Sequence, residues 1–132
     1  MFTECTACDD ADMTKLGLDV LVVLVFATLG RASHDLELGP VGVLTTAWPF
    51  LVGTVVGWLC LLRNTPAMRR WWVDGLIVAT CALVIGMLLR WITGEGTAAP
   101  FVLVATGVLL AGLLGWRAVE ALILRRRASS AG

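Results

Sequence analysis

Charged residues are scarce in this chain of 132 residues, and that scarcity limits the classes of protein to which it can belong. Lys, Arg, Asp and Glu make up 15% of the chain, hydrophobic residues make up 58%, and the mean hydropathy is +0.88. A soluble domain is typically about 25% charged and about 45–50% apolar. Because so little polar surface cannot cover a folded chain in water, we expect a lipid bilayer to be its solvent.

Residues that build catalytic and metal sites are also few. His34 is the only histidine, so one chain has no second imidazole for a bis-histidine haem or a zinc site. No Ser-His-Asp spacing, P-loop, or Gly-x-Gly-x-x-Gly motif between a strand and a helix is present. We therefore expect no enzymatic activity, no cofactor, no metal ion and no nucleic-acid partner.

The four cysteines do not define a site either. Cys5 and Cys8 lie in an acidic N-terminal segment, and one such pair alone does not define a metal or redox site. Met13 is an alternative start that would remove both of them. Cys60 and Cys81 lie within apolar runs, where we expect them to pack as small hydrophobic residues.

Long apolar runs are what the chain has in abundance. A transmembrane helix needs roughly 20 predominantly apolar residues. Four runs of this kind are present: residues 16–30, 41–62, 72–89 and 98–124. The first spans only about 22 Å at about 1.5 Å per residue, so we expect its helix to continue through Arg31 to His34, because no helix breaker precedes Gly39-Pro40.

The expected fold is therefore all-α, with one domain of four transmembrane helices over residues 16–124. Residues 1–15 are polar and acidic and are expected to form a mobile tail. Residues 125–132 begin with three arginines and are expected to form a basic cytoplasmic tail.

A repeated motif indicates how these helices are organised. Thr46-Ala-Trp-Pro-Phe50 begins the second run, and Thr97-Ala-Ala-Pro-Phe101 begins the fourth. Proline fits the first turn of a helix, where its missing N–H is not needed. The motif predicts two tandem helical hairpins, residues 16–62 and 72–124, that arose by internal duplication and form parallel repeats.

Positive charge is sorted along the chain in a way that predicts its orientation. Of the ten Lys and Arg residues, only Arg31 and Arg90 lie at the two hairpin turns; the others lie near the termini or in the central loop. The positive-inside rule then places both termini in the cytoplasm. We expect a multi-pass protein of the plasma membrane, with the bilayer as its main partner.

Polar residues at the two outer turns form the first candidate site. Ionisable side chains at membrane depth are costly unless they are paired or hydrated. The candidate residues are Arg31, Ser33, His34, Arg90, Thr93, Glu95 and Thr97. They would form an anion-attracting vestibule or a head-group site; alternatively, the two arginines reach the interface and pair with Asp35 or Glu95.

Asp19 and Asp74, each near the inner start of a run, form a second candidate set. One interpretation is a proton or cation site that the two halves share. The alternative is structural: both carboxylates stabilise helix N-termini and pair with Arg63 and Arg117 across the hairpin.

Small residues at helical spacing indicate close helix packing. The first pair is Gly53 and Gly57, and the second set is Gly107, Ala111 and Gly115. Such spacing lets a neighbouring helix approach closely, which favours association in lipid. The neighbour can be another helix of the chain, a second copy or a partner protein.

Several stretches resemble one known family. They are Asp19-Val-Leu-Val-Val-Leu-Val-Phe26, Gly30-Arg-Ala-Ser-His-Asp35, Thr46-Ala-Trp-Pro-Phe-Leu-Val-Gly53, Gly57-Trp58, Gly86 through Phe101, and Gly115-Trp-Arg117. The chain resembles small four-helix membrane proteins catalogued as a domain of unknown function (number 3054), common in actinobacteria. The resemblance implies the fold and implies no activity, because the family has none assigned.

Two functions are compatible with these features. The first is a small oligomeric transporter or channel-like protein with a polar site on its outer face. The alternative is a non-catalytic membrane scaffold or accessory subunit that packs on a partner through its Gly-x-x-x-Gly faces.

Overall fold

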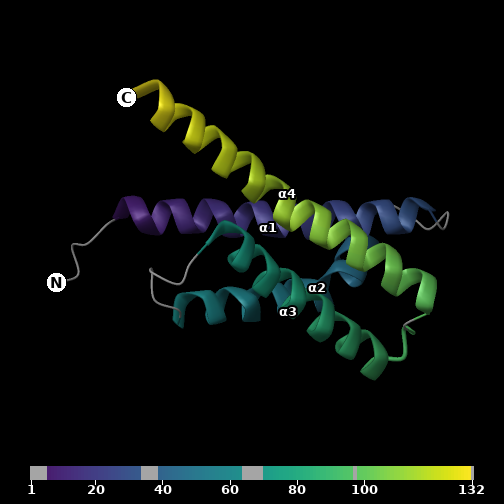
Figure 1. The fold of residues 1–132 in the computed structure, drawn as a ribbon. Coiled ribbons are helices and arrows are strands. Elements are labelled where there is room, and N and C mark those ends of the chain that lie inside the picture. Colours follow the sequence, from purple (N-terminus) through teal and green to yellow (C-terminus); the bar gives the residue numbers. More distant parts are fainter. Residues whose placement is uncertain (1–5, 34–38, 64–69, 97, 132) are drawn as a thin grey trace.

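The computed structural model of the chain is made of four helices. They are α1 (Thr6–Ser33), α2 (Pro40–Arg63), α3 (Trp71–Ile92) and α4 (Ala99–Ala131) (Figure 1). The structure describes residues 6–33, 39–63, 70–96 and 98–131. Each helix is long and apolar enough to cross a membrane, which confirms the prediction of an all-α protein with four membrane-length helices.

Two sequence-based boundaries differ from the observed ends of helices. The helix α1 begins at Thr6, and α4 continues to Ala131, so residues 6–15 and 125–131 are helical. Neither segment contains Gly or Pro, so nothing in the backbone ends the helix there. The ends of the apolar runs therefore did not predict the start of α1 or the end of α4, because both helices continue into polar sequence.

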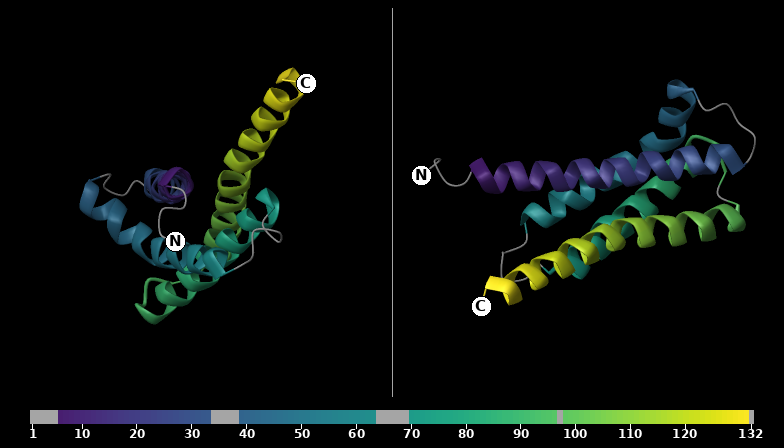
Figure 2. Two further views of the ribbon diagram at one scale, coloured as in Figure 1. Left: turned by 90° about the vertical axis from the view of Figure 1, so that its left-hand side faces the viewer. Right: turned by 90° about the horizontal axis from the view of Figure 1, so that it is seen from above.

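Each helix packs on the next one along the chain, and α1 also contacts α4. Both termini lie toward one end of the molecule, which we call the terminus end (Figures 1 and 2). The turn between α3 and α4 lies at the opposite end, which we call the turn end. The tandem-hairpin duplication and the orientation in the membrane stay predictions.

Among the described residues, α2 and α3 form the most extensive contact between two helices. A Cβ atom placed on Gly53 would lie 2.6 Å from the Cα of Ala82, and one on Gly57 would lie 2.9 Å from the Cα of Val78. Both distances are shorter than van der Waals contact, so only glycine allows this approach. Gly53 and Gly57 are therefore packing positions inside the chain and do not present a face to a partner.

The second set of small residues behaves differently. A Cβ atom on Gly107 or Gly115 would meet no atom within 4 Å, and Ala111 is exposed. The expected seam on α4 thus makes no close packing contact within the described residues. Instead, α4 turns another face inward, on which Leu109 and Leu113 are fully buried.

Three phenylalanines fill the interior toward the turn end. The ring centroids of Phe26 and Phe50 are 5.1 Å apart in an edge-to-face arrangement, and Phe101 lies 6.1 Å from Phe26. Gly86 makes room for this cluster, because a Cβ there would lie 2.5 Å from Cδ1 of Phe50. Two polar regions, described below, lie near this cluster: one at the turn end and one nearer the terminus end.

Candidate functional site

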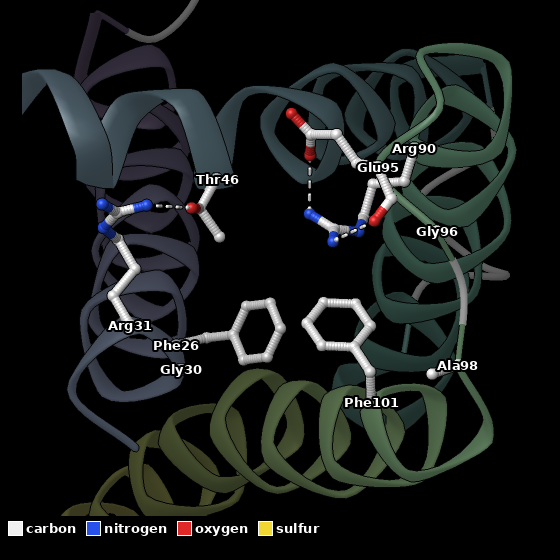
Figure 3. Close-up of a pocket in the computed structure, with 9 residues that line it drawn as sticks. All are labelled: Phe26, Gly30, Arg31, Thr46, Arg90, Glu95, Gly96, Ala98 and Phe101. Carbon is white, nitrogen blue, oxygen red and sulfur yellow. Dashed lines mark hydrogen bonds and ion pairs between the residues drawn. The ribbon is translucent and has the colours of Figure 1, made fainter. Parts of the chain in front are cut away.

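A cavity of about 280 Å³ lies at the turn end, between all four helices (Figure 3). We call it the turn-end pocket. Its lining residues are Phe26, Gly30, Arg31, Thr46, Arg90, Glu95, Gly96, Ala98 and Phe101. Arg31 and Arg90, which lie near the ends of α1 and α3, therefore line one cavity although 59 positions (90 − 31) separate them in the sequence.

Arg31 is positioned by α2. Its Nη1 donates a hydrogen bond to Oγ1 of Thr46, at 3.2 Å. Its guanidinium also occupies the place that a side chain at residue 42 would take, because a Cβ on Gly42 would lie 2.6 Å from Nη2. A glycine and a threonine one helical turn apart thus hold this cation at the wall of the pocket.

Arg90 is held from two directions. Its Nη1 donates to Oε2 of Glu95 at 2.8 Å, and its guanidinium carbon lies 4.4 Å from the ring centroid of Phe101. The side chain of Arg90 is 13% exposed and that of Glu95 is 32% exposed. The Nε of Arg90 is buried and has no hydrogen-bond partner among the described residues, so this cation retains one unused donor.

Glu95 sits at the centre of a glycine turn. Gly94 and Gly96 have φ values of +78° and +84°, a region that L-residues with a side chain rarely adopt. The backbone N–H of Glu95 donates to the carbonyl oxygen of Arg90 at 2.9 Å. This turn brings a carboxylate back onto the arginine five residues earlier, as the alternative of interfacial pairing predicts.

The other residues predicted at this end have different positions. Thr93 is exposed, and its hydroxyl donates to the carbonyl oxygens of Leu89 and Arg90, at 2.9 and 3.1 Å, at the end of α3. Ser33 is the last residue of α1. His34 and Thr97 lie outside the described residues.

Sequence reasoning missed six of the nine pocket residues as site residues: Phe26, Gly30, Thr46, Gly96, Ala98 and Phe101. Thr46 and Phe101 are the first and last positions of the motif that occurs twice, and Phe26 faces them from α1. The motif predicted two helix starts, which is correct for Pro100 in the first turn of α4 and wrong for Pro49, which lies inside α2. Nothing in the motif indicated that its two copies would contribute different residues to one cavity.

A second polar cluster lies nearer the terminus end, and its centre is Asp19. Its carboxylate is fully buried and accepts four hydrogen bonds from side chains. Trp58 Nε1 donates to Oδ2 at 2.7 Å, and Trp116 Nε1 donates to Oδ1 at 2.8 Å. Arg117 donates from Nη1 and Nη2 to the two oxygens, each at 2.7 Å. We call these four residues the Asp19 cluster.

The Asp19 cluster is saturated. An ionised carboxylate has about four lone-pair sites, and all four are used here by groups from α2 and α4. Arg117 is 4% exposed; it also donates to the carbonyl oxygen of Leu113 at 3.0 Å and lies 4.4 Å from the ring centroid of Trp116. The structural interpretation expected Asp19 to lie at a helix N-terminus and to pair across its own hairpin, and both expectations are wrong. The helix α1 begins at Thr6, and Asp19 pairs with Arg117 on α4, in the other half of the chain.

Asp74 is not a member of this cluster. It is half-buried and lines a separate, open cavity of about 460 Å³ near the terminus end. Arg70, Arg117 and Glu120 line the same cavity. The two carboxylates that sequence reasoning grouped together thus have different environments.

The two tryptophans of the Asp19 cluster are also residues that sequence reasoning missed. Gly57-Trp58 and Gly115-Trp116 form a repeated pair, one in each half of the chain. In the structure both indole N–H groups point to the same carboxylate. The repeat could have identified them as a pair, but not their common partner.

A family model described as "Protein of unknown function (DUF3054)" matches residues 16–120. Searches of curated proteins and of solved structures found no match. The matched region contains Asp19, Trp58, Trp116 and Arg117 as well as every residue that lines the turn-end pocket. The chain thus belongs to the DUF3054 family of proteins of unknown function.

Proposed function

We propose that this protein is a multi-pass membrane protein that binds a small anion in the turn-end pocket. The observation that carries the proposal is the convergence of Arg31 and Arg90 on one cavity. The nine lining residues carry two positive charges and one negative charge, that of Glu95. A cavity with excess positive charge and low-dielectric walls attracts anions.

The start of α4 adds to this preference. Ala98 lines the pocket and α4 begins at Ala99, so the N-terminus of this helix lies at the cavity. The first N–H groups of a helix carry partial positive charge. The floor of the pocket is aromatic, because Phe26 and Phe101 line it (Figure 3). Cationic walls and an apolar floor together suit an anion that carries an apolar group.

We further propose that binding serves movement across the membrane, as in a small oligomeric transporter or channel-like protein. The open cavity beside Asp74 would be the second mouth of a path that starts in the turn-end pocket. Phe26 and Phe101 line the turn-end pocket and pack with Phe50, so transport requires this cluster to open or requires assembly of several copies. With both termini in the cytoplasm, the turn-end pocket would face the outside.

Binding can be tested with the protein in nanodiscs of phosphatidylcholine, which has no net charge. The probe is fluorobenzoate, an anion with an aromatic body, followed by fluorine NMR. Arg90→Gln and Arg31→Gln should each weaken binding about tenfold or more, because each removes charge-assisted hydrogen bonds. Arg63→Gln, at the exposed end of α2, is the matched control and should bind as the parent does.

Equal binding by the parent and by Arg90→Gln would contradict the anion site. Transport is tested separately, by efflux of fluorobenzoate from liposomes that contain the protein. Binding without efflux above that of empty liposomes would leave an anion-binding protein and refute the transporter.

The second candidate function, a membrane scaffold, is favoured by the open face of α4. Gly107 and Ala111 are exposed, and a Cβ on Gly107 would meet no atom of the described residues within 4 Å. Since Gly53 and Gly57 pack against α3, the small-residue set on α4 is the one of the two predicted sets that is open to a second copy or a partner. Gly107→Leu should then reduce the mass of the assembly in detergent while the helical content stays unchanged. An unchanged mass would contradict the scaffold.

A further inference from the structure

The ion pair between Arg90 and Glu95 is asymmetric in its burial. The arginine side chain is 13% exposed, whereas the glutamate side chain is 32% exposed. The cation is thus part of the wall of the pocket, and the carboxylate reaches it from the solvent side. Two further contacts accompany the pair: Nη2 of Arg90 lies 3.5 Å from the carbonyl oxygen of Glu95, and the N–H of Glu95 donates to the carbonyl oxygen of Arg90.

The turn that carries Glu95 has a backbone that favours glycine on both sides of the carboxylate. Gly94 and Gly96 flank it, and the backbone at both has positive φ. A Cβ atom at either glycine would meet no atom of the described residues within 4 Å. Glycine is the residue with the widest choice of backbone conformations, and hinge motions use a few such positions.

Arg90 would keep its place without Glu95. Its guanidinium lies 4.4 Å from the ring centroid of Phe101, in the first turns of α4. An aromatic face attracts a guanidinium at this distance. Removal of the carboxylate therefore leaves a cation that still faces the pocket, with the donors that Glu95 had used available to another anion.

We infer that Glu95 is a built-in occupant of the anion site, and that an anionic ligand takes its place on Arg90. This inference rests on the anion site proposed above and adds how that site is regulated. The carboxylate of Glu95 also indicates the ligand class, because its position on Arg90 suits an oxyanion such as a carboxylate or a phosphate. Phe26 and Phe101 would contact the apolar part of the ligand.

The test compares Glu95→Gln and Glu95→Asp with the parent, by the same titration with fluorobenzoate in phosphatidylcholine nanodiscs. Glu95→Gln removes the competing charge, and we expect it to bind roughly three- to tenfold more tightly, since the fraction of free sites rises. Glu95→Asp keeps the charge but is one methylene shorter and cannot reach Arg90 in the same way. It should also bind more tightly than the parent.

Two results would overturn the inference. In the first, Glu95→Gln binds as the parent does or more weakly, as expected if the ion pair only shapes the site. In the second, Glu95→Gln binds more tightly while Glu95→Asp binds as the parent does. That result would show that the negative charge at residue 95 weakens binding without its carboxylate occupying Arg90. Helical content and melting temperature of each variant confirm that it is folded.

Failure of the inference and failure of the anion site give different patterns. If the parent and both Glu95 variants bind no fluorobenzoate, the anion site itself is refuted. If the parent binds and Arg90→Gln does not, while the Glu95 variants gain nothing, the site stands and only the role of Glu95 is refuted.

The natural oxyanion could be a soluble molecule or the phosphate of a lipid, and a further titration separates these sources. Nanodiscs that contain phosphatidylglycerol should weaken fluorobenzoate binding in the parent if a lipid phosphate competes for Arg90. Unchanged binding assigns the site to soluble anions. Either result keeps the role of Glu95, which is judged by the two variants alone.

Discussion

The two polar regions of this molecule contain the same kinds of groups, but one is a buried cluster and the other surrounds a cavity. In the Asp19 cluster, an arginine, a carboxylate and two indoles come from three helices, and the carboxylate is fully buried. In the turn-end pocket, an arginine, a carboxylate and aromatic rings meet around a cavity of about 280 Å³, and the carboxylate is 32% exposed.

The source of the carboxylate explains the difference. Asp19 reaches Arg117 across 98 positions of the sequence, so their pairing ties α1 to α4. Glu95 lies five positions after Arg90, so their pairing ties a turn to the helix that precedes it. Opening a pair that joins two helices would separate those helices, whereas a local pair can open without separating them. This difference is why we propose the ligand site at Arg90.

The largest effect is expected at Asp19. Replacement of Asp19 by Asn removes the charge that matches the buried Arg117 and should lower the free energy of unfolding by about 3–5 kcal/mol. The measurement is denaturation in detergent micelles followed by circular dichroism. The double variant Asp19→Leu with Arg117→Met is the control and should recover much of the loss, because no buried charge is then unpaired.

A smaller loss is expected when one donor of the Asp19 cluster is removed. Trp58→Phe keeps an aromatic ring but removes the N–H that donates at 2.7 Å, which should cost about 1.5–3 kcal/mol. Trp116→Phe removes the equivalent donor at 2.8 Å and should cost a similar amount. If Trp58→Phe is as stable as the parent, the four hydrogen bonds do not hold the cluster together.

The same substitution, Gly to Ala, should have different effects at a glycine in a helix contact and at an exposed glycine. Gly53→Ala places a Cβ 2.6 Å from the backbone of α3 and should destabilise the protein by about 1–3 kcal/mol. Gly107→Ala places a Cβ in open space and should be neutral or slightly stabilising, since alanine favours helix. Equal melting temperatures for the two variants would contradict the observed contact between α2 and α3.

The smallest effect on stability is expected at Glu95. Loss of its ion pair in Glu95→Gln should cost less than about 1 kcal/mol, because the carboxylate is partly solvated and local in sequence. The same denaturation experiment serves for this variant and for Asp19→Asn. A loss at Glu95 as large as the loss at Asp19 would show that both pairs hold the fold, and the contrast between the two regions would disappear.

Parts of the candidate site were predictable, and the reasons differ from residue to residue. Arg31 and Arg90 stood out because they are the only Lys or Arg residues at the two predicted hairpin turns. Thr46 and Gly42, which position Arg31, carry no charge and gave no such signal. For Arg90, the sequence left two alternatives open, an anion site or a pair with Glu95. It could not decide between them, because residues five apart at the end of a helix meet only if the turn folds back.

The sequence by itself determined the four helices, because runs of apolar residues of membrane length have few other conformations available in lipid. It also determined which charges lie at each end of the helices. Only the tertiary structure decided the partners: Asp19 with Arg117 and two tryptophans, Gly53 with Ala82, and Arg31 and Arg90 around one cavity. The physical reason is that helix formation depends on neighbours within about four residues, whereas these contacts depend on how whole helices rotate and cross.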